Sequence, residues 1–195
     1  MIKWLKYTTI LFLICSFSQL FAPPRKGQVN LKKQANTWAE KTFDSMTVDE
    51  RLGQLFMIEC RPTYGQAHIA EVERMVQQHH VGGIIFFKGD PTEEVIMTNR
   101  FQAMSKTKLM IAIDGEWGLA MRLANTVSYP YQLGLGGIQN EDVIYEMGVE
   151  IGRQCKRMGI HVNFAPVIDI NNNPNNPVIN YRSFGEDPEN VSKKG

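Results

Sequence analysis

The stretch "VGGIIFFKGDPTEEVIMTNRFQAMSKTKLMIAIDGE", residues 81–116, decides the fold class of this chain. It holds two continuous apolar runs, at residues 81–89 and 108–116, and between them a segment of helical character at 92–106. A continuous run of β-branched and aromatic residues is typical of a strand that is covered on both faces. A strand, a helix and a second such strand predict a βαβ unit in a parallel sheet.

The same alternation extends in both directions along the chain. Thr47 and Glu50 have the spacing of a capping box and predict a short helix. Two further strands are predicted, at residues 54–60 and 161–170. Two further helices are predicted, at residues 66–80 and 140–159. Two α/β architectures fit this order: a small doubly wound sheet, and the N-terminal half of a TIM-type (β/α)8 barrel, which typically needs ~250 residues. Both place functional side chains at the carboxyl ends of the strands.

Composition and motifs exclude several classes of function. The formal net charge of the 195 residues is +1, and no basic block predicts a nucleic-acid partner. The four histidines have no metal-ligand spacing, and no Gly-rich nucleotide-binding fingerprint is present, so we expect neither a metal nor another cofactor. Cys60 and Cys155 are too far apart for a disulfide framework and are interpreted as small buried hydrophobic residues.

The N-terminal segment predicts export. Residues 1–22 combine Lys3 and Lys6 with an apolar stretch and are interpreted as a signal peptide, with an uncleaved membrane anchor as the alternative. We therefore expect a secreted or periplasmic protein whose association with a membrane is limited to this segment. Residues 23–43 are predicted to be a linker and the start of an N-terminal helix, and residues 44–195 a single domain.

A first group of candidate binding residues follows the strand at 108–116. In "IAIDGEWGLAMRL", residues 111–123, Asp114 ends the strand, and Glu116 and Arg122 follow it. A carboxylate held at a strand end can accept hydrogen bonds from two sugar hydroxyls, and a guanidinium can donate to the same polyol. The alternative is structural: Asp114 caps the loop, and Arg122 pairs with Glu116.

A second group lies in residues 163–191, a segment rich in Asn and Pro. These residue types fix turns, by side-chain hydrogen bonds and by a locked φ, and predict a long ordered loop. Arg182, flanked by Tyr181 and Phe184, is a candidate ligand clamp. The alternative is a salt bridge from Arg182 to Glu186 or Asp187.

These motifs together resemble a known family. "GQLFMI", "GGIIFF", "IAIDGEWGLAMRL" and "NFAPVIDINNNPNNPVINYRSFGEDPENV" have the order and spacing of glycoside hydrolase family 3, over residues 44–195. The likeness is greatest to bacterial β-N-acetylhexosaminidases, which implies a (β/α)8-type barrel and a retaining mechanism on a carbohydrate substrate. It also implies that Asp114 binds sugar hydroxyls, that Arg122 and Arg182 contact the same sugar, and that Asp169 organises the loop.

The resemblance has two departures. Trp117 stands where many relatives have a glycine, which makes Trp117 and Glu116 possible subsite residues. The resemblance also implies no catalytic residue in this chain, because the nucleophilic aspartate and the acid/base histidine are expected downstream. We therefore expect a hydrolase that removes terminal β-linked N-acetylhexosamine, of which this chain is an inactive fragment. The alternatives are a β-glucosidase of the same family and a non-catalytic carbohydrate-binding pseudoenzyme.

Overall fold

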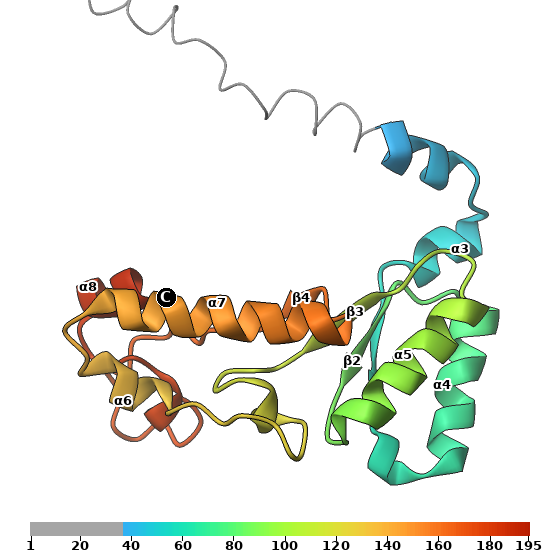
Figure 1. Cartoon of the computed structure of the whole chain (residues 1–195). Coiled ribbons are helices and arrows are strands. Elements are labelled where there is room, and N and C mark those ends of the chain that lie inside the picture. The colour runs from blue at the N-terminus through green and yellow to red at the C-terminus, as the bar shows by residue number, and fades with distance from the viewer. Residues whose placement is uncertain (1–36) are drawn as a thin grey trace, which may run out of the picture. The chain divides into compact units, whose positions relative to one another are not determined.

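The computed structural model describes residues 37–195, which divide into two compact units (Figure 1). Residues 37–44 of the first unit are helical, and the second unit comprises Thr47–Gly195. The predicted signal peptide and most of the predicted linker lie outside the described residues. Within the described range, no helix has the length and apolar character needed to cross a membrane.

The second unit opens with the predicted capping box. Helix α3 (Val48–Gly53) begins after Thr47, whose side chain accepts a hydrogen bond from the Glu50 N–H at 3.2 Å. The Glu50 side chain in turn accepts one from the Thr47 N–H at 2.8 Å. Two of the N–H groups that a helix start leaves without partners are thereby satisfied, and the predicted helix is confirmed.

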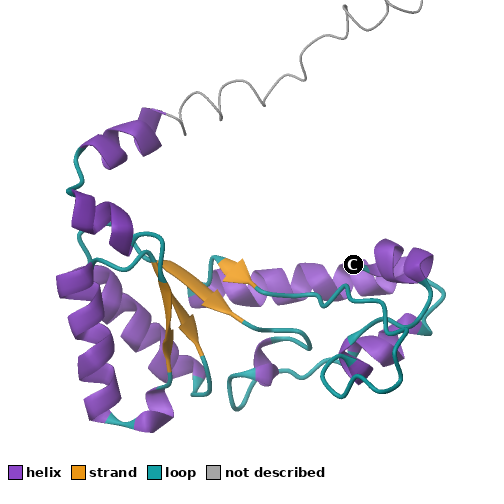
Figure 2. Cartoon of the chain, turned by 180° about the vertical axis from the view of Figure 1, so that it is seen from behind, coloured by secondary structure: helices purple, strands orange, loops and turns teal. Residues whose placement is uncertain are grey.

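Four parallel strands form one sheet in the order in which they occur in the chain (Figure 2). They are β1 (Met57–Cys60), β2 (Gly83–Phe86), β3 (Met110–Ile113) and β4 (Val162–Asn163). Gly83 lies opposite both Met57 and Met110, and Ala112 lies opposite Val162. A doubly wound sheet would reverse its strand order at a switch point. The sequential order is that of neighbouring strands in a (β/α)8 barrel, so the structure favours the predicted half-barrel.

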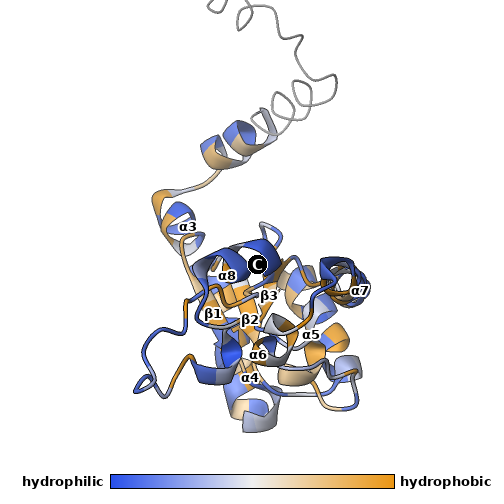
Figure 3. Cartoon of the chain, turned by 90° about the vertical axis from the view of Figure 1, so that its left-hand side faces the viewer, coloured by the Kyte–Doolittle hydropathy of each residue, from blue (hydrophilic) through white to orange (hydrophobic). Residues whose placement is uncertain are grey.

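The helices between the strands also follow the prediction. They are α4 (Gln66–His79), α5 (Pro91–Met104) and α7 (Glu141–Met158). Helix α4 packs on β1 and on α5, and α5 packs on α7. Alternate strand residues face this helix layer and build the main core with Ile69, Val76, Phe101 and Ile151. Figure 3 shows β1, β2 and β3 in the hydrophobic colours.

In the described part of the chain, helices cover only one face of the sheet. The apolar runs in the sequence had predicted that both faces would be covered. Ile84 and Ile111 are fully buried on the helix side. Met110, whose side chain points to the opposite face, is 51% exposed. The apolar character of that second face is the pattern expected of a barrel interior.

The fourth strand is much shorter than the predicted strand over residues 161–170. Among residues 37–195 it pairs with β3 alone, which ends at Ile113. The last hydrogen bond of this pair runs from the Phe164 N–H to the Ile113 carbonyl at 2.8 Å. Pro166 follows and has no N–H to donate. Asp169 therefore lies in an irregular segment and not at a strand end.

Two short helices lie outside the predicted helices, and the second begins inside the predicted loop 163–191. They are α6 (Gln132–Gly136) and α8 (Pro188–Lys194). The predicted loop 163–191 therefore ends at Asp187, whose side chain accepts from the Glu189 N–H at 3.0 Å and starts α8. Leu135 and Val191 join Ile144 and Phe184 in a second, smaller core cluster.

Candidate functional site

Charged side chains gather at the carboxyl edge of the sheet, as the strand order predicts. Glu59 and Arg61 lie at the end of β1 and form an ion pair at 3.1 Å. Asp90 follows β2, but its side chain accepts a hydrogen bond from the Thr92 N–H at 2.9 Å and caps α5. Asp90 therefore has a structural role, and the remaining candidate residues lie at the ends of β1, β3 and β4 and in the loops that follow them.

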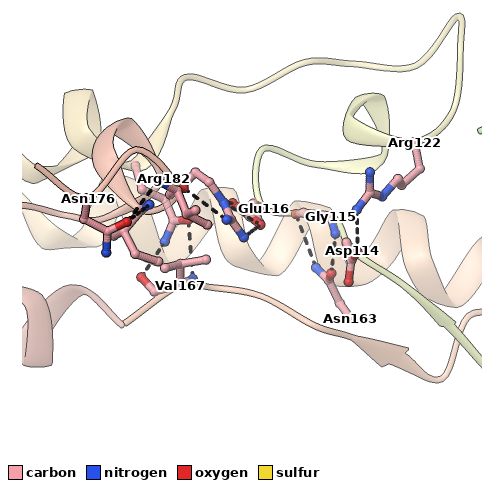
Figure 4. Close-up of polar contacts among 11 residues, drawn as sticks. Asp114, Gly115, Glu116, Arg122, Asn163, Val167, Asn176 and Arg182 are labelled. Atoms are coloured by element: carbon pink, nitrogen blue, oxygen red, sulfur yellow. Dashed lines mark hydrogen bonds and ion pairs between the residues drawn. The ribbon is translucent and has the colours of Figure 1, made fainter. Parts of the chain in front are cut away.

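Asp114 and Arg122 form the first part of the candidate site (Figure 4). Asp114 follows the last residue of β3, and its Oδ2 accepts from Nη2 of Arg122. Their side chains are 22% and 18% exposed, so the pair is partly shielded from water. The predicted alternative, in which Arg122 pairs with Glu116, is wrong, because Glu116 is engaged elsewhere.

Arg122 is also held by an aromatic ring. Its guanidinium carbon lies 4.3 Å from the centre of the Phe87 ring, and that of Arg61 lies 5.0 Å from the same ring. A guanidinium on a ring face gains a cation–π attraction. The Nε atom of Arg122 is buried and has no hydrogen-bond partner within residues 37–195. The Arg122 side chain is still 18% exposed, so the accessible part of its guanidinium, which Asp114 and Phe87 orient, can donate to a bound hydroxyl oxygen.

Glu116 and Arg182 form the second part. Nε of Arg182 donates to both carboxylate oxygens of Glu116 at 3.1 and 2.9 Å, and Nη2 donates to Oε1 at 2.6 Å. The Glu116 side chain is only 3% exposed. These hydrogen bonds raise the pKa of Arg182 above its ordinary value. The predicted alternative of a salt bridge from Arg182 to Glu186 or Asp187 is wrong.

The pairing changes what Glu116 and Arg182 can offer a ligand. Both oxygens of Glu116 are occupied, so its main effect is to orient Arg182. Arg182 also donates from Nη1 to the Val178 carbonyl at 3.2 Å. A guanidinium has five N–H donors, and one on each Nη remains for a ligand. Arg182 can therefore donate to a ligand hydroxyl. At the same time its hydrogen bonds to Glu116 hold the Arg182 loop against the end of β3.

Asn163 is a residue of the site that the sequence analysis missed. Its side-chain oxygen accepts from the Gly115 N–H at 2.8 Å, and its amide donates to the Gly115 carbonyl at 3.4 Å. Asn163 therefore holds the peptide unit directly after Asp114. A polar residue at the end of an apolar strand was the available signal, but the hydrogen bond spans 48 residues of sequence.

The loop over residues 163–187 is ordered largely by its own side chains, as predicted. The Asn173 side chain accepts from the Asn175 N–H at 3.1 Å, and that of Asn176 accepts from the Val178 N–H at 2.9 Å. Asp169 takes part through its backbone, whose carbonyl accepts from the Ser183 hydroxyl at 2.5 Å. Its side chain is exposed.

A groove of about 1050 Å³ is lined by many residues of α7 and also by Gly115 and Glu116. Asp114, Arg122 and Arg182 do not line it. Cys155 lines the groove but is buried, as is Cys60, and both are free thiols, as the sequence predicts. Burial raises the pKa of Cys60 to about 12, so this thiol is not a nucleophile at neutral pH.

The motifs that build this edge are those of one family. Residues 47–195 match the family described as the glycosyl hydrolase family 3 N-terminal domain. This chain belongs to glycosyl hydrolase family 3.

Relatives in family 3 and one of its solved structures agree with this assignment. Beta-hexosaminidase A of Pseudoalteromonas piscicida is 32% identical over 176 residues, which cover 77% of this chain and 29% of that protein. A family 3 β-N-acetylglucosaminidase of Paenibacillus sp. has 33% sequence identity and a TM-score of 0.66, over 77% of this chain and 30% of that one. A periplasmic beta-glucosidase of Salmonella typhimurium is 27% identical over 129 residues, 66% of this chain and 16% of that protein.

The chain thus spans less than a third of the length of each of these family 3 proteins. The predicted family and the predicted partial (β/α)8 barrel are confirmed.

Proposed function

We propose that this chain carries a sugar-binding site of a glycosidase that removes terminal β-linked N-acetylhexosamine from carbohydrate or cell-wall glycans. The observation that carries the proposal is the Asp114–Arg122 pair at the end of β3, whose side chains are fixed by their ion pair and by the Phe87 ring and are still partly exposed to a ligand. Asp114 accepts hydrogen bonds from sugar hydroxyls, and Arg122 and Arg182 donate to oxygens of the same sugar. The names of two relatives support the choice of sugar: a beta-hexosaminidase at 32% identity and a β-N-acetylglucosaminidase at 33%.

We assign no catalytic residue to this chain. A retaining glycosidase needs a nucleophile and an acid/base group, usually two carboxyls ~5–5.5 Å apart. Three carboxylates lie at the ends of β1 and β3, and each is ion-paired with an arginine: Glu59, Asp114 and Glu116. We therefore propose that the 195-residue chain binds the sugar without hydrolysing it, and that an aspartate and a histidine outside this chain complete the reaction.

The test is calorimetric titration of the chain with N-acetylglucosamine. Asp114→Asn keeps the shape of the side chain but replaces one acceptor oxygen by a donor, and we expect it to weaken binding at least roughly tenfold, since a charge-assisted hydrogen bond contributes ~1.5–3 kcal/mol. Asp49→Asn, at an exposed position in the first turn of α3, is the control. Equal affinities for the two variants would return Asp114 to a structural role. Substantial hydrolysis of a nitrophenyl β-N-acetylglucosaminide by this chain would contradict the absence of catalytic residues.

A β-glucosidase is the second candidate, and the relative named periplasmic beta-glucosidase supports it. The two sugars differ at one ring position, which carries an acetamido group in N-acetylglucosamine and a hydroxyl in glucose. Titration with glucose separates the candidates: tighter binding of glucose than of N-acetylglucosamine favours the glucosidase.

The same relative supports an extracytoplasmic location. We propose that residues 1–22 direct export to the periplasm or the medium and that Ala22 is the last residue removed. N-terminal sequencing of the exported protein tests this, because the mature chain is expected to begin at Pro23. Retention of residues 1–22 at the membrane would favour the anchor.

A further inference from the structure

Three aromatic rings from separate segments of the chain form one cluster beside the candidate site. The centre of the Trp117 ring lies 4.8 Å from that of Tyr131, with an interplanar angle of 88°. The centre of the Tyr131 ring lies 4.6 Å from that of Tyr181, at 48°. Edge-to-face and tilted arrangements at such distances are favourable contacts between aromatic side chains. Trp117, Tyr131 and Tyr181 are called the aromatic cluster below.

The aromatic cluster is not part of the hydrophobic core. Tyr131 is 49% exposed and Tyr181 is 45% exposed, whereas the residues of the neighbouring core cluster, such as Leu135 and Phe184, are 4% exposed. The segment between Trp117 and Tyr131 is tied by a hydrogen bond from the Tyr129 N–H to the Trp117 carbonyl at 3.0 Å. The rings are thus half-open to solvent on an anchored backbone, which lowers the entropy lost when a ligand binds.

The aromatic cluster is continuous with the sugar-binding residues. Trp117 directly follows Glu116, and Tyr181 directly precedes Arg182. The hydrogen bonds between Glu116 and Arg182 therefore bring together the two segments that carry the outer rings. The outer rings of the aromatic cluster are therefore next to Glu116 and Arg182 along the chain.

We propose that the aromatic cluster is a second sugar subsite, which stacks the next ring of a β-linked glycan. A pyranose ring with equatorial substituents presents axial C–H groups on both faces, and such an apolar face packs on an aromatic ring while the hydroxyls stay in water. The ligand class is an oligosaccharide of β-linked N-acetylglucosamine. This inference deepens the proposed function and rests on it, and it gives Trp117 a role in substrate choice.

The test compares N-acetylglucosamine with its β-linked disaccharide, N,N′-diacetylchitobiose (chitobiose below), by calorimetric titration of the 195-residue chain. We expect the disaccharide to bind roughly three- to tenfold more tightly, since contacts of aromatic rings contribute ~0.5–1.5 kcal/mol beyond the area that they bury. Tyr131→Ala and Tyr181→Ala should abolish this gain and leave the affinity for the monosaccharide unchanged. Tyr131 supplies no side-chain hydrogen bond to the start of α6, so its truncation removes no helix cap.

Two further variants and a local probe complete the design. Tyr131→Phe keeps the ring and should keep the gain, and Tyr145→Ala, a 74% exposed tyrosine of α7 outside the aromatic cluster, is the matched control. With fluorotryptophan incorporated at the three tryptophans, the fluorine resonance of Trp117, assigned with Trp117→Phe, should shift on addition of chitobiose more than on addition of the monosaccharide.

The outcomes separate the two proposals. If N-acetylglucosamine binds and Asp114→Asn weakens it, but chitobiose shows no gain or the Tyr→Ala variants keep the gain, the second subsite is overturned and the proposed function stands. If neither sugar binds, both are overturned. A gain that Tyr145→Ala removes equally would also contradict the assignment to the aromatic cluster.

Discussion

Two buried glutamates, in different regions of the molecule, differ in whether their carboxylate has a partner. Glu116, at the carboxyl edge of the sheet, is 6% exposed and is held by the fork of Arg182. Glu94, on α5 in the helix layer, is fully buried, and neither of its carboxylate oxygens has a hydrogen-bond partner within the described residues. The first carboxylate is compensated by a guanidinium, whereas the second lies among apolar side chains and thiols.

The physical consequences differ accordingly. The carboxylate of Glu116 is bonded to the guanidinium of Arg182, and this ion pair joins the loop after β3 to the loop that carries Arg182. A buried carboxyl without a partner resists ionisation, and burial raises the pKa of Glu94 to about 7. A charge on Glu94 would also disfavour the thiolate forms of Cys60 and Cys155. The buried carboxylate of Glu116 therefore helps to build the candidate site, whereas ionisation of the buried Glu94 lowers the stability of the fold.

The largest loss of stability is expected when the partner of Glu116 is removed. Arg182→Ala leaves a buried carboxylate without compensation, which costs about 3–5 kcal/mol for a fully buried pair. Because the Arg182 side chain is 29% exposed, we expect the lower end of that range, about 3 kcal/mol, measured as the free energy of unfolding in urea.

A double-mutant cycle shows whether the charge pair itself is responsible. Glu116→Gln combined with Arg182→Ala should be less destabilised than Arg182→Ala alone, because the double variant buries no charge. If the two effects add, the loss reflects packing of the Arg182 side chain and not the ion pair.

The second prediction concerns the charge of Glu94, which, unlike that of Glu116, has no partner within the described residues. Glu94→Gln keeps the size of the side chain and removes the ionisation. A rise of the pKa from 4.5 to about 7 corresponds to a cost of roughly 3 kcal/mol for the ionised form. Since the amide is also buried without a partner, we expect about 2 kcal/mol of stabilisation above pH 7.

The pH dependence is the sharper measurement. Between pH 4.5 and about pH 7 the folded state binds more protons at Glu94 than the unfolded state, so stability falls as the pH rises through this window and stays low above it. Glu94→Gln should remove this fall. Glu93→Gln, at the adjacent exposed position, should retain it. An identical pH profile in the two variants would mean that Glu94 ionises freely in the folded protein.

Local patterns predicted the elements of both regions well. Apolar runs placed β2 and β3, the Thr47–Glu50 spacing placed α3, and the Asn-rich composition indicated an ordered loop. These features depend on residues close in sequence, where propensity and side-chain hydrogen bonds act directly. Asp114 and Arg122, which the sequence placed in one group of candidate residues, are in contact, and only eight positions separate them.

Interactions over long sequence distances were not predictable in this way. Both proposed alternatives for the arginines used nearby acids, but Glu116 and Arg182 are 66 residues apart. Only the parallel order of the strands brings their loops to one edge. Glu94 could not be told from its exposed neighbour Glu93, because the pattern of α5 does not show which of two adjacent glutamates faces the core.

A third prediction concerns the neutral hydrogen bonds of the same edge. Asn163→Ala removes the acceptor of the buried Gly115 N–H and should cost about 1 kcal/mol in the free energy of unfolding, since an unsatisfied buried donor costs ~1–3 kcal/mol and water can enter the space of the lost side chain. Asn163→Asp keeps an acceptor oxygen toward Gly115 and should lose less. Equal losses would show that the amide's second hydrogen bond, to the Gly115 carbonyl, is the important one.

The smallest effect is expected for an ion pair that shares the chemistry of Glu116 and Arg182 but not their burial. Arg153 and Glu150 pair one turn apart on α7, and their side chains are 71% and 39% exposed. Water solvates both charges when the pair is broken, so Arg153→Ala should change the free energy of unfolding by less than about 0.5 kcal/mol. Added salt should reduce even this difference, because exposed charges are screened. A loss close to that of Arg182→Ala would mean that burial is not what distinguishes the two pairs, and that the contrast between the edge of the sheet and the helix surface must come from packing.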